Sequence, residues 1–244
     1  MLKLALAAAA AATVALPAQA LTTGDLAFTG FNADKDYWSV VALTDIAPNT
    51  QVFFSDNEWN GSAFNDTNEH TLVWNTGAEV IAAGTVVLFT EIDAATDTIT
   101  ASIGTLGLAA GGGTGLGLSA TADTLYAYLG AAVAPTTFLA AISSEASATN
   151  MTNAGLVVGV NAVKLTSDAD YGEYTGIRAG QTSFAAYGAL VNNSANWNIL
   201  VGGDQAALVP STVAFTVTPV PEASTTAMLL AGLAAMGFVA RRRA

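Results

Sequence analysis

The amino-acid sequence predicts an all-β protein whose antiparallel strands form a β-sandwich. Short runs rich in Val, Thr, Phe, Tyr and Leu alternate with Gly, Asn and Asp over residues 21–208, which is typical of strands separated by turns. Over the same residues no apolar stripe keeps the 3.6-residue period for the length of an ordinary helix. Several short strands at regular spacing favour a sandwich over alternating strand–helix units.

The expected strands are the apolar runs, each bounded by turn residues. In chain order they are residues 25–31, 37–44, 51–55, 70–74, 85–90, 98–103, 116–120, 124–129, 137–142, 162–165, 173–177, 197–201 and 212–217. Residues 182–191 are the best candidate for a short helix. Small residues without a strong pattern dominate residues 143–160, which predicts a long surface loop.

Glycines are concentrated in residues 111–117, just before one of the expected strands. We expect them to form a flexible hairpin loop. A phosphate-binding loop is excluded because the lysine that a P-loop needs is missing, and so is the helix that nucleotide motifs need.

Charge and cysteine content limit the partners and the chemistry of this chain. Residues 21–220 contain eighteen acidic residues and three cations, a net charge of −15. Nucleic acid and anionic lipid are disfavoured as partners because phosphate binding depends on Lys and Arg, whereas divalent cations suit clustered carboxylates. The chain has no cysteine, which excludes disulfides, thiol catalysis and thiolate zinc sites.

The first twenty residues have the features of a cleaved signal peptide. Met1-Leu2-Lys3 is a short basic segment, residues 4–16 are an Ala/Leu/Val run, and Ala18-Gln19-Ala20 fits the small-x-small cleavage rule. We therefore expect signal peptidase to recognise Ala18 and Ala20, and the mature chain to begin near Leu21. An uncleaved anchor helix is disfavoured because the apolar run is short and ends in a proline.

The last residues of the chain form three consecutive parts. The first is a short Pro-Glu motif, Val220, Pro221, Glu222 and Ala223. The second is a mostly apolar segment, residues 225–240, which as a helix rises about 24 Å, a little less than a hydrocarbon core of roughly 30 Å. The third is a basic cluster, Arg241, Arg242 and Arg243, which would hold that end on the cytoplasmic side of the membrane.

This order of parts resembles the PEP-CTERM sorting signal, the class processed by exosortases in Gram-negative bacteria, although Ala223 stands where the commonest form has a second proline. The resemblance implies that the tail holds the protein in the inner membrane until an exosortase-like enzyme cuts near Pro221 and Glu222. The body would then pass to the cell surface or the extracellular matrix of a bacterium that makes exopolysaccharide, with a role in biofilm.

A second resemblance covers residues 24–130. The segments that carry it are GDLAFTGFN at 24–32, VVALTDI at 40–46, FFSDNEW at 53–59, IAAGTVVLF at 81–89, and LS with DTLYAY at 118–128. Their order resembles a lamin-tail module, an immunoglobulin-like β-sandwich of bacterial surface proteins. The resemblance implies a sandwich with a binding or structural role.

The chain therefore divides into four expected segments. They are a signal peptide at 1–20, an exported β-sandwich body at 21–208, a linker at 209–219, and the sorting signal at 220–244 with its transmembrane helix at 225–240. Within the body, residues 21–135 carry the lamin-tail-like part and residues 136–208 an additional β region.

Two kinds of catalysis are compatible with parts of this sequence. His70 is the only histidine, and the chain has no Gly-x-Ser-x-Gly elbow, so a serine hydrolase is disfavoured and His70 is expected to begin a strand. Glycoside hydrolysis needs only two carboxylates about 5–10 Å apart, so it stays open as an alternative. Four tryptophans could stack on a sugar: Trp38, Trp59, Trp74 and Trp197, although Trp74 lies in a strand that favours the core.

Calcium is the metal that these acids favour, because it takes six to eight oxygen ligands from carboxylates and carbonyls. The candidate ligands lie in two expected loops, one with Asp34 and Asp36, the other with Asp168, Asp170 and Glu173. Asp56-Asn57-Glu58 follows an expected strand and is a weaker third candidate. The alternative is that all these acids lie in solvated turns. No other cofactor is expected.

Together these features predict an exported, non-catalytic protein of the cell surface or extracellular matrix, with a structural or binding role. The expected partners are an exosortase-like processing enzyme, signal peptidase, the inner membrane through the tail helix, and exopolysaccharide. A secreted carbohydrate-active hydrolase and a calcium-dependent adhesin remain the alternatives.

Overall fold

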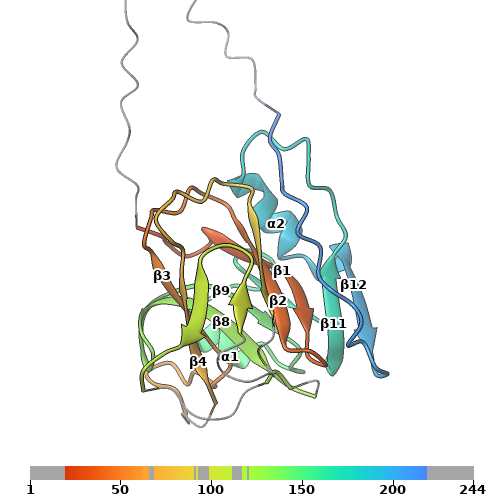
Figure 1. Cartoon of the computed structure of the whole chain (residues 1–244). Helices are drawn as coiled ribbons and strands as arrows, with labels where there is room; N and C mark the ends of the chain where they lie inside the picture. Colours follow the sequence, from red (N-terminus) through yellow and green to blue (C-terminus); the bar gives the residue numbers. More distant parts are fainter. Residues whose placement is uncertain are drawn as a thin grey trace, which may run out of the picture.

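A computed structural model describes residues 20–65, 69–90, 92, 99–111, 117–119 and 121–218. Strands dominate these residues and form two six-stranded sheets that pack face to face (Figure 1). This arrangement is the all-β sandwich that the alternating apolar runs predict. The chain crosses repeatedly between the two sheets, so neither sheet is built from one continuous part of the sequence.

The first sheet has the strand order β12-β11-β1-β2-β5-β6, with every neighbouring pair antiparallel. Its strands are β1 (Leu26–Asn32), β2 (Tyr37–Ala42), β5 (Val86–Thr90), β6 (Thr100–Ala101), β11 (Ala169–Tyr174) and β12 (Trp197–Val201). β1 and β2 are buried almost throughout, which explains why their apolar residues do not alternate with polar ones.

The second sheet has the order β10-β9-β8-β3-β4-β7. Its strands are β3 (Gln51–Ser55), β4 (Thr71–Asn75), β7 (Thr105–Leu108), β8 (Thr124–Ala131), β9 (Ala134–Ser143) and β10 (Ala162–Lys164). Only the β9–β10 pair is parallel among the paired strands of the described residues. Because β9 and β10 join this sheet while β11 and β12 join the first, residues 136–208 complete both sheets.

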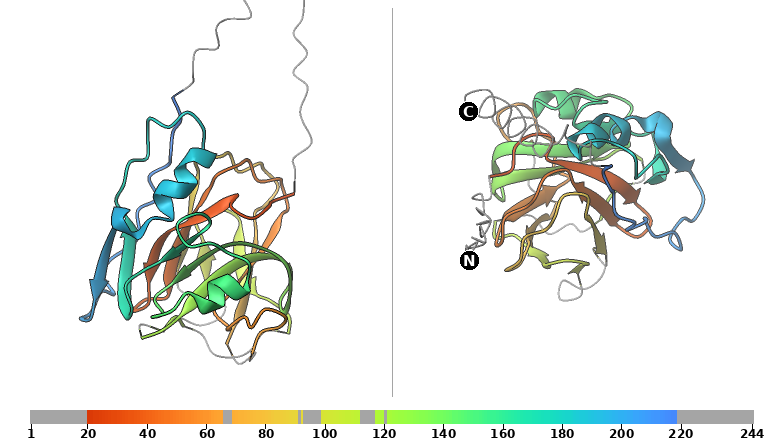
Figure 2. Two further views of the ribbon diagram at one scale, coloured as in Figure 1. Left: turned by 180° about the vertical axis from the view of Figure 1, so that it is seen from behind. Right: turned by 90° about the horizontal axis from the view of Figure 1, so that it is seen from above.

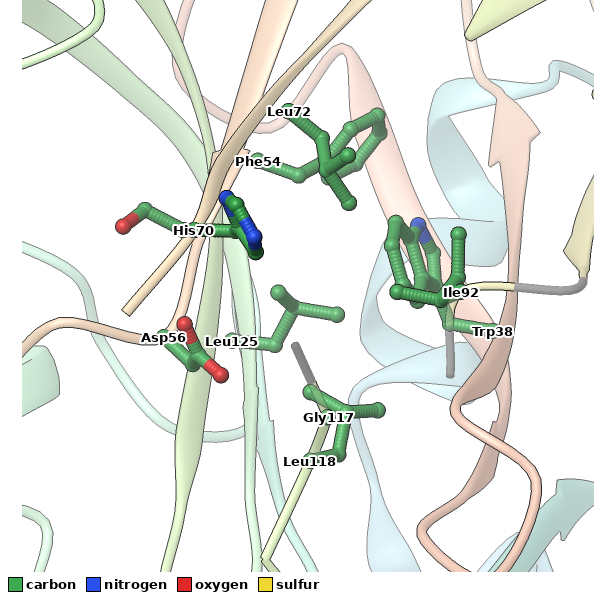
Figure 3. Close-up of a pocket in the computed structure, with 10 residues that line it drawn as sticks. Trp38, Phe54, Asp56, His70, Leu72, Ile92, Gly117, Leu118 and Leu125 are labelled. Atoms are coloured by element: carbon green, nitrogen blue, oxygen red, sulfur yellow. The ribbon is translucent and has the colours of Figure 1, made fainter. Parts of the chain in front are cut away.

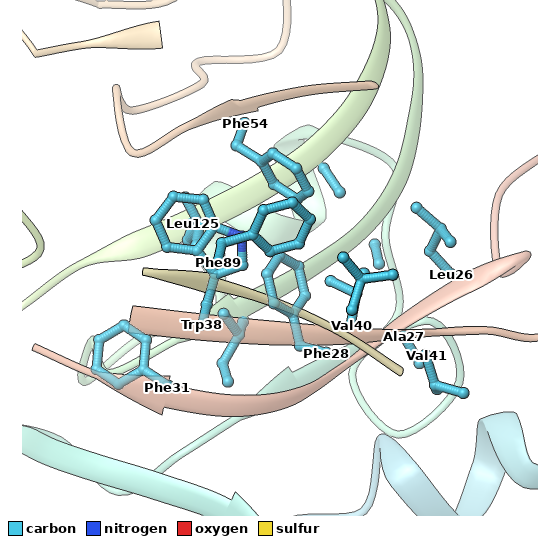
Figure 4. Packing of buried hydrophobic residues seen from close by; sticks show 14 of the residues in the cluster. Leu26, Ala27, Phe28, Phe31, Trp38, Val40, Val41, Phe54, Phe89 and Leu125 are labelled. Carbon is cyan, nitrogen blue, oxygen red and sulfur yellow. The ribbon is translucent and has the colours of Figure 1, made fainter. Parts of the chain in front are cut away.

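The core lies between the two sheets and is centred on aromatic rings from both. Trp38 of β2 and Phe54 of β3 have ring centroids 5.3 Å apart, and Phe89 of β5 lies 4.9 Å from Phe54 (Figure 4). All three side chains are buried. The edge-on and tilted contacts of such rings add to the stability that comes from burying their area.

A second aromatic cluster covers the outer face of the second sheet. It contains Tyr126 and Tyr128 of β8 and Phe138 of β9, and it packs against Met151. Met151 belongs to the short helix α1 (Thr149–Asn153), which lies over this face when the molecule is seen from behind (Figure 2). The part of this face over β8 and β9 is therefore buried as well.

Several element predictions need correction. The strand expected at 98–103 is only β6, and among the described residues 117–119 there is no strand where 116–120 was expected. β7 was missed because its sequence, TLGL, contains a glycine and is only four residues long. The surface loop expected at 143–160 contains α1.

The short helix expected at 182–191 is present as η1 (Ala185–Tyr187) followed by α2 (Gly188–Val191). A further 3-10 turn, η2 (Ser194–Asn196), leads into β12. The side chains of Tyr187 and Val191 are buried in the main core cluster. Packing of these apolar residues, rather than helix propensity, therefore stabilises the helical conformation of this short segment.

Candidate functional site

Acidic residues gather at one end of the sandwich. Adjacent antiparallel strands place the end of one strand beside the start of the next, and acids follow β3 and β9 and precede β4 and β8. We call this region the acidic end and define it by Asp36, Asp56, Glu58, Glu69, Asp123, Glu145 and Asp168. Asp36 comes from the β1–β2 turn, so both sheets contribute.

Both carboxylate oxygens of Asp123 accept hydrogen bonds from backbone N–H groups. Its Oδ2 accepts a 2.8 Å hydrogen bond from the backbone nitrogen of Ser119, and its Oδ1 accepts one of 2.8 Å from that of Thr124. The residue is 7% exposed. Asp123 thus holds the loop that leads into β8, and its carboxylate lies under protein rather than in solvent.

Asp56 directly follows β3 and is also 7% exposed. Its neighbour Asn57 donates from Nδ2 to the hydroxyl oxygen of Ser55 at 2.8 Å and to the backbone oxygen of Glu69 at 3.3 Å. These bonds tie the end of β3 to the start of β4. Oδ1 of Asn57 is buried and accepts no hydrogen bond from the described residues, so it is an oxygen that a water or a cation could engage.

Burial and like charge raise the pKa values of both buried carboxyls. For Asp123, burial is the main cause, Glu69 and Glu58 add to it, and the pKa rises to about 7. For Asp56, burial again comes first, followed by the charges of Asp123 and Glu69, and its pKa is raised well above the usual value. These carboxyls therefore bind protons more readily than ordinary aspartates near neutral pH.

A small cavity opens beside Asp56 at this end of the molecule. Asp56 and His70 line one side of it, and Trp38 and Ile92 line the other (Figure 3). The cavity has room for roughly one water molecule. His70 does precede β4, as expected, but the cavity beside it is too small to admit a sugar ring.

The two aspartates of the first predicted calcium loop serve different parts of the chain. Oδ2 of Asp34 accepts a 2.6 Å hydrogen bond from the backbone nitrogen of Gln205. Asp36, which is 6% exposed, accepts one from the backbone nitrogen of Leu118. Each carboxylate therefore fastens a loop to the β1–β2 turn.

The second predicted calcium segment is not a loop. Residues 169–174 form β11, and only Asp168 lies in a turn, where its φ of 59° is left-handed. Glu173 accepts hydrogen bonds from the hydroxyl of Tyr171 at 2.8 Å and from the backbone nitrogen of Ser211 at 3.0 Å. Pairing of β11 between β1 and β12 extends this segment along the sheet, so its acids do not converge.

Within the described part of the chain, no group of three or more His, Cys, Asp or Glu side chains is arranged to hold a metal ion. The acids predicted as calcium ligands, Asp34 with Asp36 and Asp168 with Asp170 and Glu173, accordingly form no such group. The acidic end combines Asp36 and Asp168 of these segments with further carboxylates, above all Asp56 and Asp123.

The segment expected to be a linker lies against the body. We call residues 210–218 the C-terminal strap. Pro210 packs on Gly30, where an added Cβ would come within 2.2 Å of the proline ring. Further along, the backbone nitrogens of Phe215, Thr216 and Thr218 donate to backbone oxygens of the body at 2.8, 2.8 and 2.9 Å. The strap is therefore bonded to the body up to its last residue.

Phe215 is the only buried side chain among residues 211–218 and is 2% exposed. Its ring lies 5.7 Å from that of Tyr174 and 4.9 Å from that of Tyr187. Arg178 covers it, with the guanidinium carbon 5.0 Å from the ring centroid, and donates from Nη1 to the backbone oxygen of Val213 at 2.6 Å. An aromatic pocket and one arginine thus hold the strap.

The last residues of the strap, 215–218, and the acidic end lie at opposite ends of the sandwich (Figure 1). Phe215 bonds to Gly84, which precedes the start of β5. β5 begins where the antiparallel β2 finishes, and Asp36 precedes the other end of β2. Thr218, the last described residue, is therefore far from the carboxylates.

The predicted processing residues fall outside the described residues, apart from Ala20. These are Ala18, the motif Val220, Pro221, Glu222 and Ala223, the apolar segment 225–240, and Arg241, Arg242 and Arg243. Among the described residues, no helix is long and apolar enough to cross a membrane.

Asp123 is the functional candidate that the sequence interpretation missed. It stands alone between small residues, with no second acid nearby in sequence. The one feature of the sequence that could have identified Asp123 is its position directly before an expected strand, since Asp56 and Glu69 also lie directly after or before expected strands. Their convergence depends on which strands pair, and that pairing is not visible in the sequence.

Comparison with known proteins identifies the tail and leaves the body without a match. The family model of the PEP-CTERM protein-sorting motif matches residues 219–243. No curated protein and no solved structure matches the chain, so the lamin-tail resemblance stays a prediction. The matched motif implies an exported protein that is held transiently in the membrane and processed by an exosortase. The chain therefore carries a PEP-CTERM protein-sorting motif over residues 219–243.

Proposed function

We propose that the body of this protein has a non-catalytic, structural or binding role at the cell surface or in the extracellular matrix of a Gram-negative bacterium. One observation carries the proposal: the last residues of the strap, 215–218, which lead to the sorting signal, lie at the end of the sandwich opposite the acidic end. A body tethered through its strap would present the acidic end away from the membrane. Repulsion between its acids and anionic lipid favours the same orientation.

The bonding of the polar groups supports a role without catalysis. The hydroxyl oxygen of Ser55 accepts from Asn57 and from Thr71, so it is engaged in holding two strand ends. Asp123 accepts from two backbone nitrogens. The cavity beside Asp56 has room for roughly one water molecule, which leaves no space for a sugar ring next to these groups.

We infer exopolysaccharide as the partner of the acidic end. Exposed acids such as Glu58 and Asp168 repel a polyanion directly, so an acidic polymer would be bridged by divalent cations and a neutral polymer would not need them. Calcium is the cation expected, since carboxylate oxygens are its preferred ligands. A calcium-dependent adhesin is thus one form of the same proposal.

Binding of the mature protein to exopolysaccharide purified from its host tests the partner. The protein should sediment with the polymer, and the variant Glu58→Gln with Asp168→Asn should sediment less. Glu79→Gln is the matched control, because Glu79 is exposed on the loop between β4 and β5 at the strap end. If a chelator abolishes sedimentation with the polymer, divalent cations bridge the protein and the polymer. Equal sedimentation of all variants would contradict binding through the acidic end.

Sorting is tested by the mass and location of the protein in its host, with and without the exosortase-like enzyme. We expect a product lacking residues 1–20 and the tail, found outside the inner membrane only when the enzyme is present. A full-length C-terminus in the inner membrane of both strains would contradict processing and make residues 225–240 a permanent anchor.

A second candidate function is carbohydrate hydrolysis by Asp56 and Asp123, which requires the cavity beside Asp56 to widen until it admits a sugar ring. The observation in its favour is the raised pKa of both carboxyls, as in glycosidases that use a protonated carboxylic acid. Its test is release of reducing ends from host exopolysaccharide, compared with Asp56→Asn and Asp123→Asn. Release that both variants abolish would replace the non-catalytic proposal.

A further inference from the structure

The strap ends where the sorting motif begins. Thr218 donates its backbone N–H to the oxygen of Gln181 at 2.9 Å, and the family match starts at residue 219. Only two residues lie between Thr218 and Pro221, so the two are at most about 10 Å apart in an extended chain. A processing enzyme that acts near Pro221 and Glu222 therefore works directly beside the folded body.

A hydrolytic enzyme reaches a segment only when its backbone is free to be bound, so cleavage of a hydrogen-bonded segment follows the fraction of molecules in which it has opened. In the docked strap, the backbone N–H groups of Phe215, Thr216 and Thr218 are all bonded to the body. They are unavailable to an enzyme that must bind several residues on the body side of the motif.

The strap is also built so that it can open without unfolding the sandwich. Phe215 is the only buried side chain of residues 211–218, and Val213 is 63% exposed. The strap adds no long strand to either sheet, since its only bridge joins Val217 to Gln181. Releasing one ring and a few hydrogen bonds would leave every strand pair intact.

We propose that residues 215–218 are part of the segment that the exosortase-class enzyme binds, and that the strap must leave the body before processing. Docking of the strap then sets the rate at which the folded protein is released from the membrane. This inference rests on the proposed sorting function. It adds that the enzyme binds residues that precede the motif as well as the motif itself.

A reversible cross-link tests the proposal directly. Gln181 and Val217 are partners in a parallel bridge, and paired strands lie about 4.8 Å apart, within the Cα separation of roughly 4.4–6.8 Å that a disulfide spans. The chain has no cysteine of its own, so Gln181→Cys with Val217→Cys introduces the only pair. The full-length precursor is oxidised, purified in detergent and added to host membranes that contain the enzyme.

We expect the oxidised pair to be processed at least about tenfold more slowly than the wild type, since a tenfold change corresponds to only 1.4 kcal/mol. Prior reduction should raise the rate of the pair to that of the single variant Val217→Cys, and the single variant Gln181→Cys, which lies outside the bound segment, should match the wild type. Phe215→Ala, which loosens the strap, should be processed several-fold faster. The cysteine pair keeps the test valid if that variant folds poorly.

Processing of the oxidised pair at the wild-type rate would overturn the proposal, because docking of the strap would then not limit the access of the enzyme to the motif. Failure of the wild-type precursor to be processed at all is a different result. It would refute the sorting function on which the proposal rests.

Discussion

At the scale of single residues, the buried carboxyls of Asp56 and Asp123, with their raised pKa values, are the least ordinary feature of this protein. Asp56 and Asp123 are each 7% exposed, and burial and neighbouring acids raise both pKa values. Hydrogen bonds from Ser119 and Thr124 to Asp123 favour its charged form and offset part of this effect. The protein therefore retains ionisable groups at a cost in stability, which is a common property of functional sites.

The raised pKa of Asp123 predicts that the mature protein is more stable in mild acid than in mild base. An unfolded aspartate has a pKa near 3.9 and the folded one about 7, so between these values the folded state binds more protons than the unfolded state. The stability that Asp123 contributes to the folded state is fully present below about pH 4 and is lost as pH rises through about 7. Asp56 acts in the same direction.

Urea unfolding at about pH 5 and pH 8 measures this effect. We expect a free energy of unfolding lower at pH 8 by on the order of 3 kcal/mol, and Asp123→Asn should reduce the difference. Glu79→Gln, at an exposed position, should leave it unchanged. Greater stability at pH 8 than at pH 5 would show that a bound cation or another group outweighs these carboxyls.

At the scale of elements, the strap is the segment whose structure differs most from what its sequence predicts. Residues 210–218 contain Pro, Ser and Thr like a linker, yet Phe215 fills a pocket between Tyr174 and Tyr187. Two glycines permit the docking. Gly30 leaves room for Pro210, and a Cβ on Gly84 would come within 2.4 Å of the backbone oxygen of Phe215.

The single buried ring predicts that Phe215→Ala opens the strap and spares the sheets. Hydrogen exchange at the backbone amides of Thr216 and Thr218 should become much faster, while exchange in β8 and β9 stays slow. The free energy of unfolding should fall by up to about 3–5 kcal/mol, the usual range for this substitution in a core. Exposed Val213 offers the control, since Val213→Ala should change stability by less than about 0.5 kcal/mol. Unchanged amide exchange in Phe215→Ala would mean that the hydrogen bonds hold the strap without the ring.

At the scale of the whole molecule, charge is distributed unevenly along the sandwich. The body carries a net charge of −15, and seven of its described acids lie at the acidic end. Like charges close together destabilise the compact state through mutual repulsion. The same repulsion keeps copies of the protein apart and resists adsorption to anionic membranes.

This charge predicts that salt stabilises the mature protein. Raising sodium chloride from about 10 mM to about 200 mM shortens the screening length from roughly 30 Å to below 10 Å, so the melting temperature should rise by a few degrees. Calcium should achieve the same rise at a much lower concentration if it binds the acidic end. A melting temperature that falls with salt would show that attractive ion pairs outweigh the repulsion.

Much of the fold was predictable because its signals are local. The strands over residues 51–55 and 197–201 begin and end where the apolar runs do, since β-branched and aromatic residues mark such strands directly. The lengths of β6 and β7 and the place of α1 were not predictable, because edge strands and single-turn helices depend on the partners they meet.

The sequence by itself determined that the protein carries a sorting signal, that its body is all-β, and that the body has a strong negative charge. These follow from composition and from motifs read one after another along the chain, such as the tail matched over residues 219–243. Only the tertiary structure decided that Asp56 and Asp123 share one end, and that Phe215 docks against Tyr174 and Tyr187. The reason is physical: such groups meet only through strand pairing and packing between residues far apart in sequence, and no local pattern encodes those partners.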